Sequence, residues 1–129
     1  MDKNEAIRAH TEWKKGLSAY LKNPNGSLSP SEVDRADACD LGRWIDGEGE
    51  AQFPTDMAFR HLRQAHSLFH SRAADIVRRA NDGERVSAGA ALGSHSDCAD
   101  ASSEVVTSLM ALPISGHNVR ARRPAMSLR

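Results

Sequence analysis

Several features are scarce in this chain of 129 residues, and each scarcity excludes a class of protein. Its two cysteines, Cys39 and Cys98, are too few for the disulfide framework of a small secreted domain, so we expect thiols or metal ligands. The roughly 18 consecutive apolar residues of a membrane-spanning helix occur nowhere, and the N-terminus lacks the apolar core of a secretion signal. We therefore expect a cytoplasmic protein with no membrane partner.

An excess of charge is also lacking, because seventeen basic and seventeen acidic side chains cancel. The balance is uneven along the chain, since residues 113–129 contain no acid and four arginines, namely Arg120, Arg122, Arg123 and Arg129. The rest of the chain is therefore net acidic, which argues against nucleic acid as a partner, because phosphate binding needs a basic face. We expect residues 1–112 to form one folded domain and residues 113–129 to form a disordered basic tail.

Apolar stripes at helical spacing recur along the chain, and no alternating pattern indicates a strand. The predicted helices cover residues 4–22, Pro30 to about Ile45, Pro54 to about Asn81, and about Arg85 to Leu112. Gly42 lies inside the second helix as a place for a bend, and Gly47 and Gly49 are expected to end it. Four helices joined by short connections predict an all-α fold, an antiparallel four-helix bundle.

The third predicted helix carries His66 and His70 four residues apart within its apolar stripe. Side chains at this spacing lie on one face, one turn apart, so both imidazoles can bind the same metal ion. The spacing alone is a weak signal, because it also occurs on many helix surfaces. The apolar surroundings favour a ligand pair, since two unpaired buried imidazoles are costly.

His10 lies on the apolar stripe of the first predicted helix, and Cys39 lies in the second. Together with His66 and His70 they would supply three nitrogens and one sulfur, a tetrahedral set that suits zinc. The residues by themselves leave another interpretation open. A lone core histidine is more often a satisfied hydrogen-bonding group, and a lone buried cysteine is usually a small hydrophobic residue.

The order of these residues resembles that of the chemoreceptor zinc-binding domain family. The matching positions are His10 followed by Trp13, the run Cys39-Asp40-Leu41-Gly42-Arg43-Trp44, and the pair His66 and His70 preceded by Phe59 and Leu62. The resemblance covers roughly residues 4 to 112. It is specific because the types of ligand, their order, and the accompanying glycine and tryptophan all match.

The resemblance implies that one zinc ion is bound by His10, Cys39, His66 and His70. It also implies that Gly42 lets helices approach closely and that Trp44 packs over the metal layer. Sensing of zinc, or of oxidants such as hypochlorous acid through the zinc-bound cysteine, is the implied function. Related domains are attached to chemoreceptors or diguanylate cyclases, which implies a signalling protein partner in chemotaxis or cyclic-di-GMP signalling and allows a homodimer. We expect a stand-alone member here, because 129 residues leave no room for an output domain.

We expect the remaining candidate ligands to lie outside the metal site. His61 falls on the flank of the third helix, and His95 and Cys98 share the inward face of the last helix as core residues or as neighbours of the ligands. Asp37 and Asp40 flank the cysteine of the second helix, where either could accept a hydrogen bond from a ligand imidazole. Solvated carboxylates are the favoured interpretation for both.

The leading hypothesis is therefore a zinc-binding sensor that is not an enzyme. One alternative is a metal-dependent enzyme of the helical-bundle type, in which three histidines leave a fourth position open for water, but Cys39 would fill that position. The sequence offers no Ser-His-Asp order, glycine-rich phosphate loop or carboxylate pair as another catalytic arrangement. A second alternative is a structural zinc-binding protein or a zinc buffer.

Overall fold

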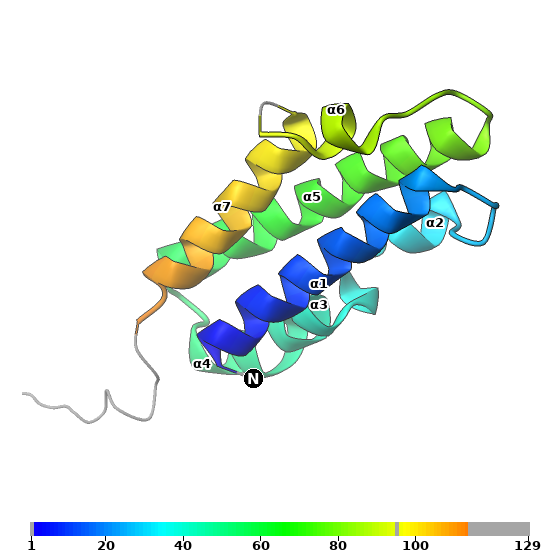
Figure 1. Cartoon of the computed structure of the whole chain (residues 1–129). Coiled ribbons are helices and arrows are strands. Elements are labelled where there is room, and N and C mark those ends of the chain that lie inside the picture. Colours follow the sequence, from blue (N-terminus) through cyan, green and yellow to red (C-terminus); the bar gives the residue numbers. More distant parts are fainter. Residues whose placement is uncertain (1, 95, 114–129) are drawn as a thin grey trace, which may run out of the picture.

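The regular elements of the protein are all helical over the residues that the structure, a computed structural model, describes, which are 2–94 and 96–113 (Figure 1). The helices are α1 (Lys3–Lys22), α2 (Pro30–Val33), α3 (Asp40–Trp44), α4 (Glu50–Gln52), α5 (Met57–Asn81), α6 (Ala88–Leu92) and α7 (Asp97–Ala111). A 3-10 turn (Ala36–Ala38) precedes α3, and a π-helical turn (Ile45–Gly49) joins α3 to α4. The all-α expectation is confirmed.

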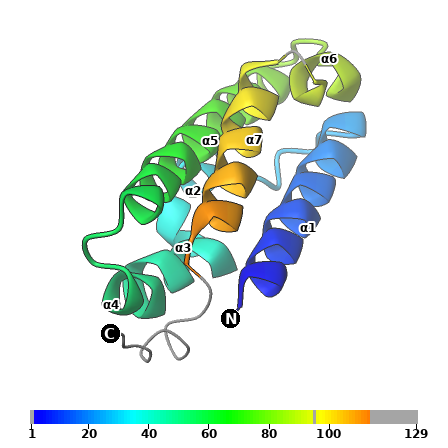
Figure 2. The ribbon, with the colours of Figure 1, turned by 90° about the vertical axis from the view of Figure 1, so that its left-hand side faces the viewer.

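Three long helices, α1, α5 and α7, set the frame of the molecule (Figures 1 and 2). Helix α5 packs along α7 and also contacts α2, while α1 contacts α3, α5, α6 and α7. The core lies between these helices, and its largest fully buried side chains are Phe59, Phe69, Leu41, Leu62, Leu109, Val77 and Val105. Most of these residues belong to α5 and α7, so the face of α5 that carries the histidine pair points into the centre of the fold.

Helices α1 and α5 agree closely with the predicted segments. Helix α1 begins after Asp2, whose carboxylate accepts a hydrogen bond from the backbone N–H of Glu5 at 2.8 Å, while the Glu5 carboxylate accepts one from Asp2 N–H. Helix α5 begins a few residues later than Pro54, because Asp56 is its N-cap and accepts from Phe59 N–H at 2.9 Å.

The second predicted helix is wrong as a continuous element. Helix α2 ends at Val33, and the backbone is extended at Arg35 and again at Cys39 before α3 begins. Gly47 and Gly49, which were expected to end the segment, lie within the π-helical turn that continues into α4. This later part of the segment is held to α5 by the guanidinium of Arg63.

The last predicted helix is also interrupted. Helix α6 ends at Leu92, and α7 begins only after Ser96, whose hydroxyl accepts from Ala99 N–H at 3.1 Å. A backbone turn with Gly93 separates the two helices. His95 lies outside the described residues, and so do residues 114–129, which are all but the first residue of the predicted basic tail.

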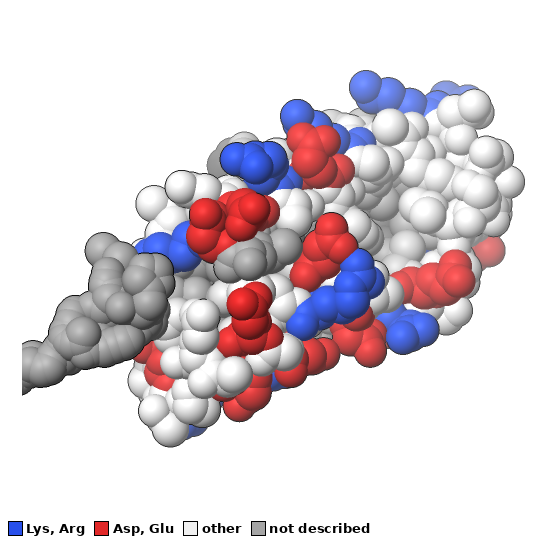
Figure 3. All heavy atoms as spheres, turned by 90° about the horizontal axis from the view of Figure 1, so that it is seen from below, with Lys and Arg blue, Asp and Glu red and all other residues white. Residues whose placement is uncertain are grey.

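The surface carries charges of both signs. On the face shown in Figure 3, acidic and basic side chains are interspersed rather than gathered into one basic area. Within the described part of the chain, no helix combines the length and the apolar character needed to cross a bilayer.

Candidate metal centre

Cys39 is placed by the turn that interrupts the second predicted helix. It is the N-cap of α3, and its sulfur accepts a hydrogen bond from Gly42 N–H at 3.3 Å. A Cβ at Gly42 would lie 1.7 Å from the carbonyl oxygen of Ala36, so only glycine allows the preceding turn to fold back this closely. The close approach expected at Gly42 is therefore confirmed, but it is to the neighbouring turn rather than to another long helix.

His66 and His70 meet this sulfur from the buried face of α5. Each imidazole is only 2% exposed, and the two ring centroids are 4.6 Å apart. The Cys39 sulfur lies 3.3 Å from Nε2 of His66 and 3.5 Å from Nε2 of His70. The three donor atoms lie within 4.8 Å of one another.

These distances fit a bound zinc ion. A sulfur and a nitrogen at two corners of a tetrahedral zinc site are separated by about 3.6 Å, given ordinary Zn–S and Zn–N bond lengths. The two sulfur-to-nitrogen distances of 3.3 and 3.5 Å are close to that separation. The donor set of one thiol and two imidazoles is also one that zinc prefers.

The orientation of His70 is set by a backbone group of α2. Its Nδ1 lies 2.8 Å from the carbonyl oxygen of Val33, and because a carbonyl can only accept, Nδ1 carries the proton. Nε2 then presents its lone pair toward Cys39, as a metal ligand must. The Trp13 ring packs against the same imidazole at a centroid distance of 4.6 Å.

Burial keeps the imidazoles in the neutral form that binds metal. Desolvation is the main cause that lowers the pKa of His66 to about 3, and repulsion from His70 and His10 acts in the same direction. Burial lowers the pKa of His70 as well. Desolvation raises the pKa of the Cys39 thiol, against the backbone hydrogen bonds from Gly42 and Leu41. Burial alone thus favours the neutral thiol of Cys39, and a cation beside the sulfur would favour the thiolate instead.

His10, the fourth predicted ligand, is buried nearby but lies outside the group of three. Its side chain is 3% exposed, its ring packs against Phe69 at 4.7 Å, and its Nε2 lies 2.9 Å from the hydroxyl of Ser102 on α7. Burial lowers the pKa of His10 to about 4. The structure thus brings together Cys39, His66 and His70, and His10 stays a prediction as a ligand.

Three contacts of the site were missed by the sequence reasoning. The contact with the Val33 carbonyl cannot be predicted from the sequence, because every residue has a backbone carbonyl. Ser102 is a hydroxyl on an apolar stripe, which is a usable signal for a buried partner. Trp44 was expected over the metal layer, but its ring packs against Phe53 and Phe59 at 6.4 and 6.3 Å. Trp13 is the tryptophan that covers a ligand.

The other candidate residues lie away from the cluster. His61 is exposed, with Nε2 3.3 Å from the Glu104 carboxylate. Asp37 and Asp40 are exposed and pair with nearby arginines, in agreement with the favoured interpretation of solvated acids. Cys98 is buried in α7, and desolvation raises its pKa to about 11.

Comparison with known proteins gives one match. The family model described as the chemoreceptor zinc-binding domain matches residues 10–77, a range that begins at His10 and includes Cys39, His66 and His70. No curated protein matches the chain, and no solved structure matches it.

Proposed function

This chain belongs to the chemoreceptor zinc-binding domain family, and from that premise we propose that it is a cytoplasmic sensor module that responds to zinc availability or to oxidants. The observation that carries the proposal is the cluster in which the Cys39 sulfur lies 3.3 and 3.5 Å from Nε2 of His66 and His70. Zinc bound there would stabilise the thiolate of Cys39 and join α5 to the segment that precedes α3.

In this proposal His10 is the fourth ligand. Its ring packs against Phe69, whose ring also packs against His70 at 5.5 Å, and its hydrogen bond with Ser102 links α1 to α7. A site that uses His10, Cys39, His66 and His70 would tie the elements around it into a four-helix bundle, with the broken segment from α2 to α4 as the second member. Occupancy of the site would then influence the contact between α1 and α7.

Cys39 gives the same site a response to oxidants. Thiolate sulfur can be oxidised to sulfenic acid and beyond, whereas imidazole resists such oxidation. The oxidised sulfur is a poorer zinc ligand and a different N-cap for α3. Loss of this ligand would loosen the segment around α3, and a protein partner would recognise the change. We propose a chemoreceptor or a diguanylate cyclase pathway as that partner, and a homodimer as the assembly.

We propose that the module is not an enzyme. With His10 as the fourth ligand, the zinc ion would have four protein donors and no position open for water, which a catalytic zinc site requires. A structural zinc protein or zinc buffer would share this site and would differ from a sensor in its zinc affinity and in its lack of a signalling partner.

The test is metal analysis of protein purified without added zinc. We expect one zinc per chain, and a loss of zinc affinity of more than roughly tenfold in each of His10→Ala, Cys39→Ala, His66→Ala and His70→Ala, since even groups that only support a ligand cost that much. His61→Ala is the matched control, because it removes an exposed imidazole from the same helix as two ligands. Retention of zinc by the Cys39 and His70 variants would overturn the site, and retention by the His10 variant alone would remove only the fourth ligand.

Hypochlorous acid provides the second arm of the test. It should convert Cys39 to an oxidised form and release zinc in proportion, before the histidines are modified. Zinc that stays bound to protein oxidised at Cys39 would rule out the oxidant response and leave zinc sensing or a structural role.

A further inference from the structure

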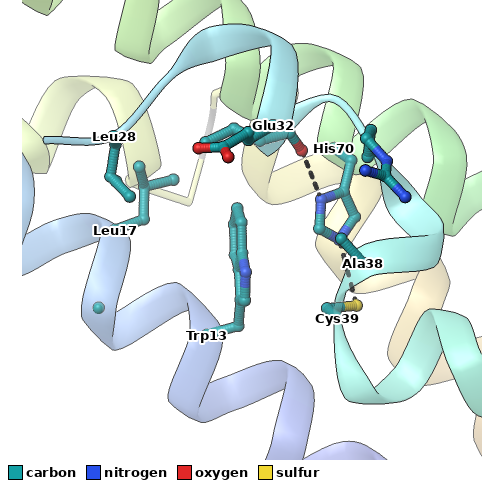
Figure 4. A pocket seen from close by; sticks show the side chains of 10 residues that line it. Trp13, Leu17, Leu28, Glu32, Ala38, Cys39 and His70 are labelled. Atoms are coloured by element: carbon teal, nitrogen blue, oxygen red, sulfur yellow. Dashed lines mark hydrogen bonds between the residues drawn. The ribbon is translucent and has the colours of Figure 1, made fainter.

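An apolar cavity opens beside the metal cluster, between α1 and the segment that contains α2 (Figure 4). Its volume is about 340 Å³. Trp13, Leu28 and Val33 contribute to its mostly apolar lining, and Cys39 and His70 border it. Two charged residues, Glu32 and Arg35, also line it. A small oxidant inside this cavity would therefore be in contact with Cys39, whose sulfur is oxidised in the proposed function.

Gly16 lines the same cavity from the middle of α1. A Cβ added there would meet nothing within 4 Å, in contrast to Gly42, where the added atom would lie 1.7 Å from a carbonyl oxygen. Glycine in a helix interior costs about 1 kcal/mol relative to alanine. Close packing does not explain this glycine. Gly16 is exposed, so a larger side chain would have room there beside the other residues that line the cavity.

A second cavity, of about 510 Å³, borders Cys39 and has a charged lining that includes Arg8, Glu12 and Asp40. Arg43 also lines it, and this side chain pairs with Asp40 and donates to the carbonyl oxygen of Ala38 at 2.7 Å. Four charged side chains thus line this approach, against two, Glu32 and Arg35, in the first cavity. The two approaches to the sulfur differ in polarity.

We propose that the mostly apolar cavity lined by Gly16 is the route by which small neutral oxidants reach the sulfur of Cys39. The inference rests on the oxidant response proposed above and names the class of molecule that the site admits. A mostly apolar lining penalises ions because they must give up much of their hydration, whereas an uncharged molecule loses little. Neutral hypochlorous acid therefore reaches Cys39 through the cavity faster than anions such as hypochlorite do.

The reaction at the end of this route balances without a further reagent. The Cys39 thiolate sulfur gives up two electrons, and the bond between oxygen and chlorine breaks. Chlorine leaves as chloride, and the hydroxyl group stays on the sulfur to form sulfenic acid.

The test compares Gly16→Leu with Ala9→Leu in the full chain loaded with zinc. Both changes add a leucine side chain to α1, but Gly16 lines the apolar cavity and Ala9 lines the charged one. The rate of Cys39 oxidation by hypochlorous acid is followed by mass spectrometry of the peptide that contains it. We expect the Gly16 variant to react more slowly by roughly fivefold or more because its path is filled, and the Ala9 variant to react within about twofold of the unmodified protein.

A measurement on the unmodified chain makes the test independent of how the variants fold. Iodoacetamide and iodoacetate differ in charge and little in size, so their rates at Cys39 are compared with their rates at free cysteine. We expect the neutral reagent to be favoured at Cys39 by roughly fivefold or more relative to free cysteine. Equal preference, or a greater slowing by Ala9→Leu than by Gly16→Leu, would overturn the route. Oxidation that fails to release zinc would overturn the oxidant response of the proposed function, while the rates would still decide the route.

Discussion

Gly42 shows at the scale of one residue why a glycine follows the candidate ligand Cys39 at this spacing. Its backbone N–H donates to the cysteine sulfur, and its missing side chain leaves room for the Ala36 carbonyl. The hydrogen bond and the free space both stabilise the turn that holds Cys39. Gly42 therefore contributes to the shape of the metal site without offering a ligand atom.

Gly42→Ala is expected to destabilise the fold and to weaken zinc binding. The added methyl group would lie 1.7 Å from the Ala36 carbonyl oxygen, so the turn that holds Cys39 must move. We expect a loss of roughly 1–3 kcal/mol in the free energy of unfolding, the usual cost of overpacking, and a weaker affinity for zinc. Denaturant titration and competition with a chelator measure the two effects.

Gly47→Ala is the matched control for that experiment. A Cβ at Gly47 meets nothing within 4 Å, although the residue lies only five positions further along the same segment. Its stability and zinc affinity should stay close to those of the unmodified chain. Equal losses in both variants would contradict the role assigned to Gly42.

The sequence predicted the ligand cluster better than its supporting contacts. The His66 and His70 spacing was informative because it combines a helical period with an apolar stripe, and the structure places both rings beside Cys39. The partners of the imidazoles were not predictable in the same way. One is the backbone carbonyl of Val33, and the other is a hydroxyl on a helix that is distant in sequence, Ser102.

At the scale of the elements, the broken segment between α1 and α5 is the main difference from the predicted fold. Its apolar spacing suits a continuous helix, but the Cys39 sulfur and the Val33 carbonyl must both reach α5. The extended backbone at Arg35 and Cys39 allows this. Tertiary contacts of this kind override local periodicity, and they cannot be read from the spacing of apolar residues.

Removal of zinc should increase hydrogen exchange in residues 36–46 more than in α5. The segment consists of a 3-10 turn and the short helix α3, and the Cys39 sulfur is the N-cap of that helix. Helix α5 has 25 residues, and its buried face packs along α7. Short elements with few buried contacts open more readily once a ligand is lost.

Exchange measured by mass spectrometry, with and without a chelator, tests this expectation. The peptide that contains α6 serves as the internal reference, because it holds none of the three clustered donors and neither His10 nor Ser102. An equal rise in residues 36–46, α5 and α6 would indicate general loosening instead.

At the scale of the whole molecule, three buried imidazoles stand close to the centre of the fold. His10, His66 and His70 are each at most 3% exposed, and they come from the two long helices α1 and α5. Their lowered pKa values mean that the folded chain binds fewer protons than the unfolded chain in mildly acidic solution. The site therefore couples the stability of the fold to pH.

The protein stripped of zinc is expected to lose stability as the pH falls from about 6.5, the ordinary pKa of histidine, toward about 4. In this range the unfolded state takes up protons that the folded state excludes, so acid favours unfolding. Each histidine with a fully lowered pKa lowers the free energy of unfolding by roughly 1.4 kcal/mol for each pH unit of acidification. This dependence ends at the pH where the imidazoles of the folded state take up protons.

Denaturant titrations at several pH values in the presence of a chelator measure the effect. His66→Gln should make the dependence shallower, because one titrating group is removed. A free energy of unfolding that stays constant or rises between pH 6.5 and 4 would contradict the prediction.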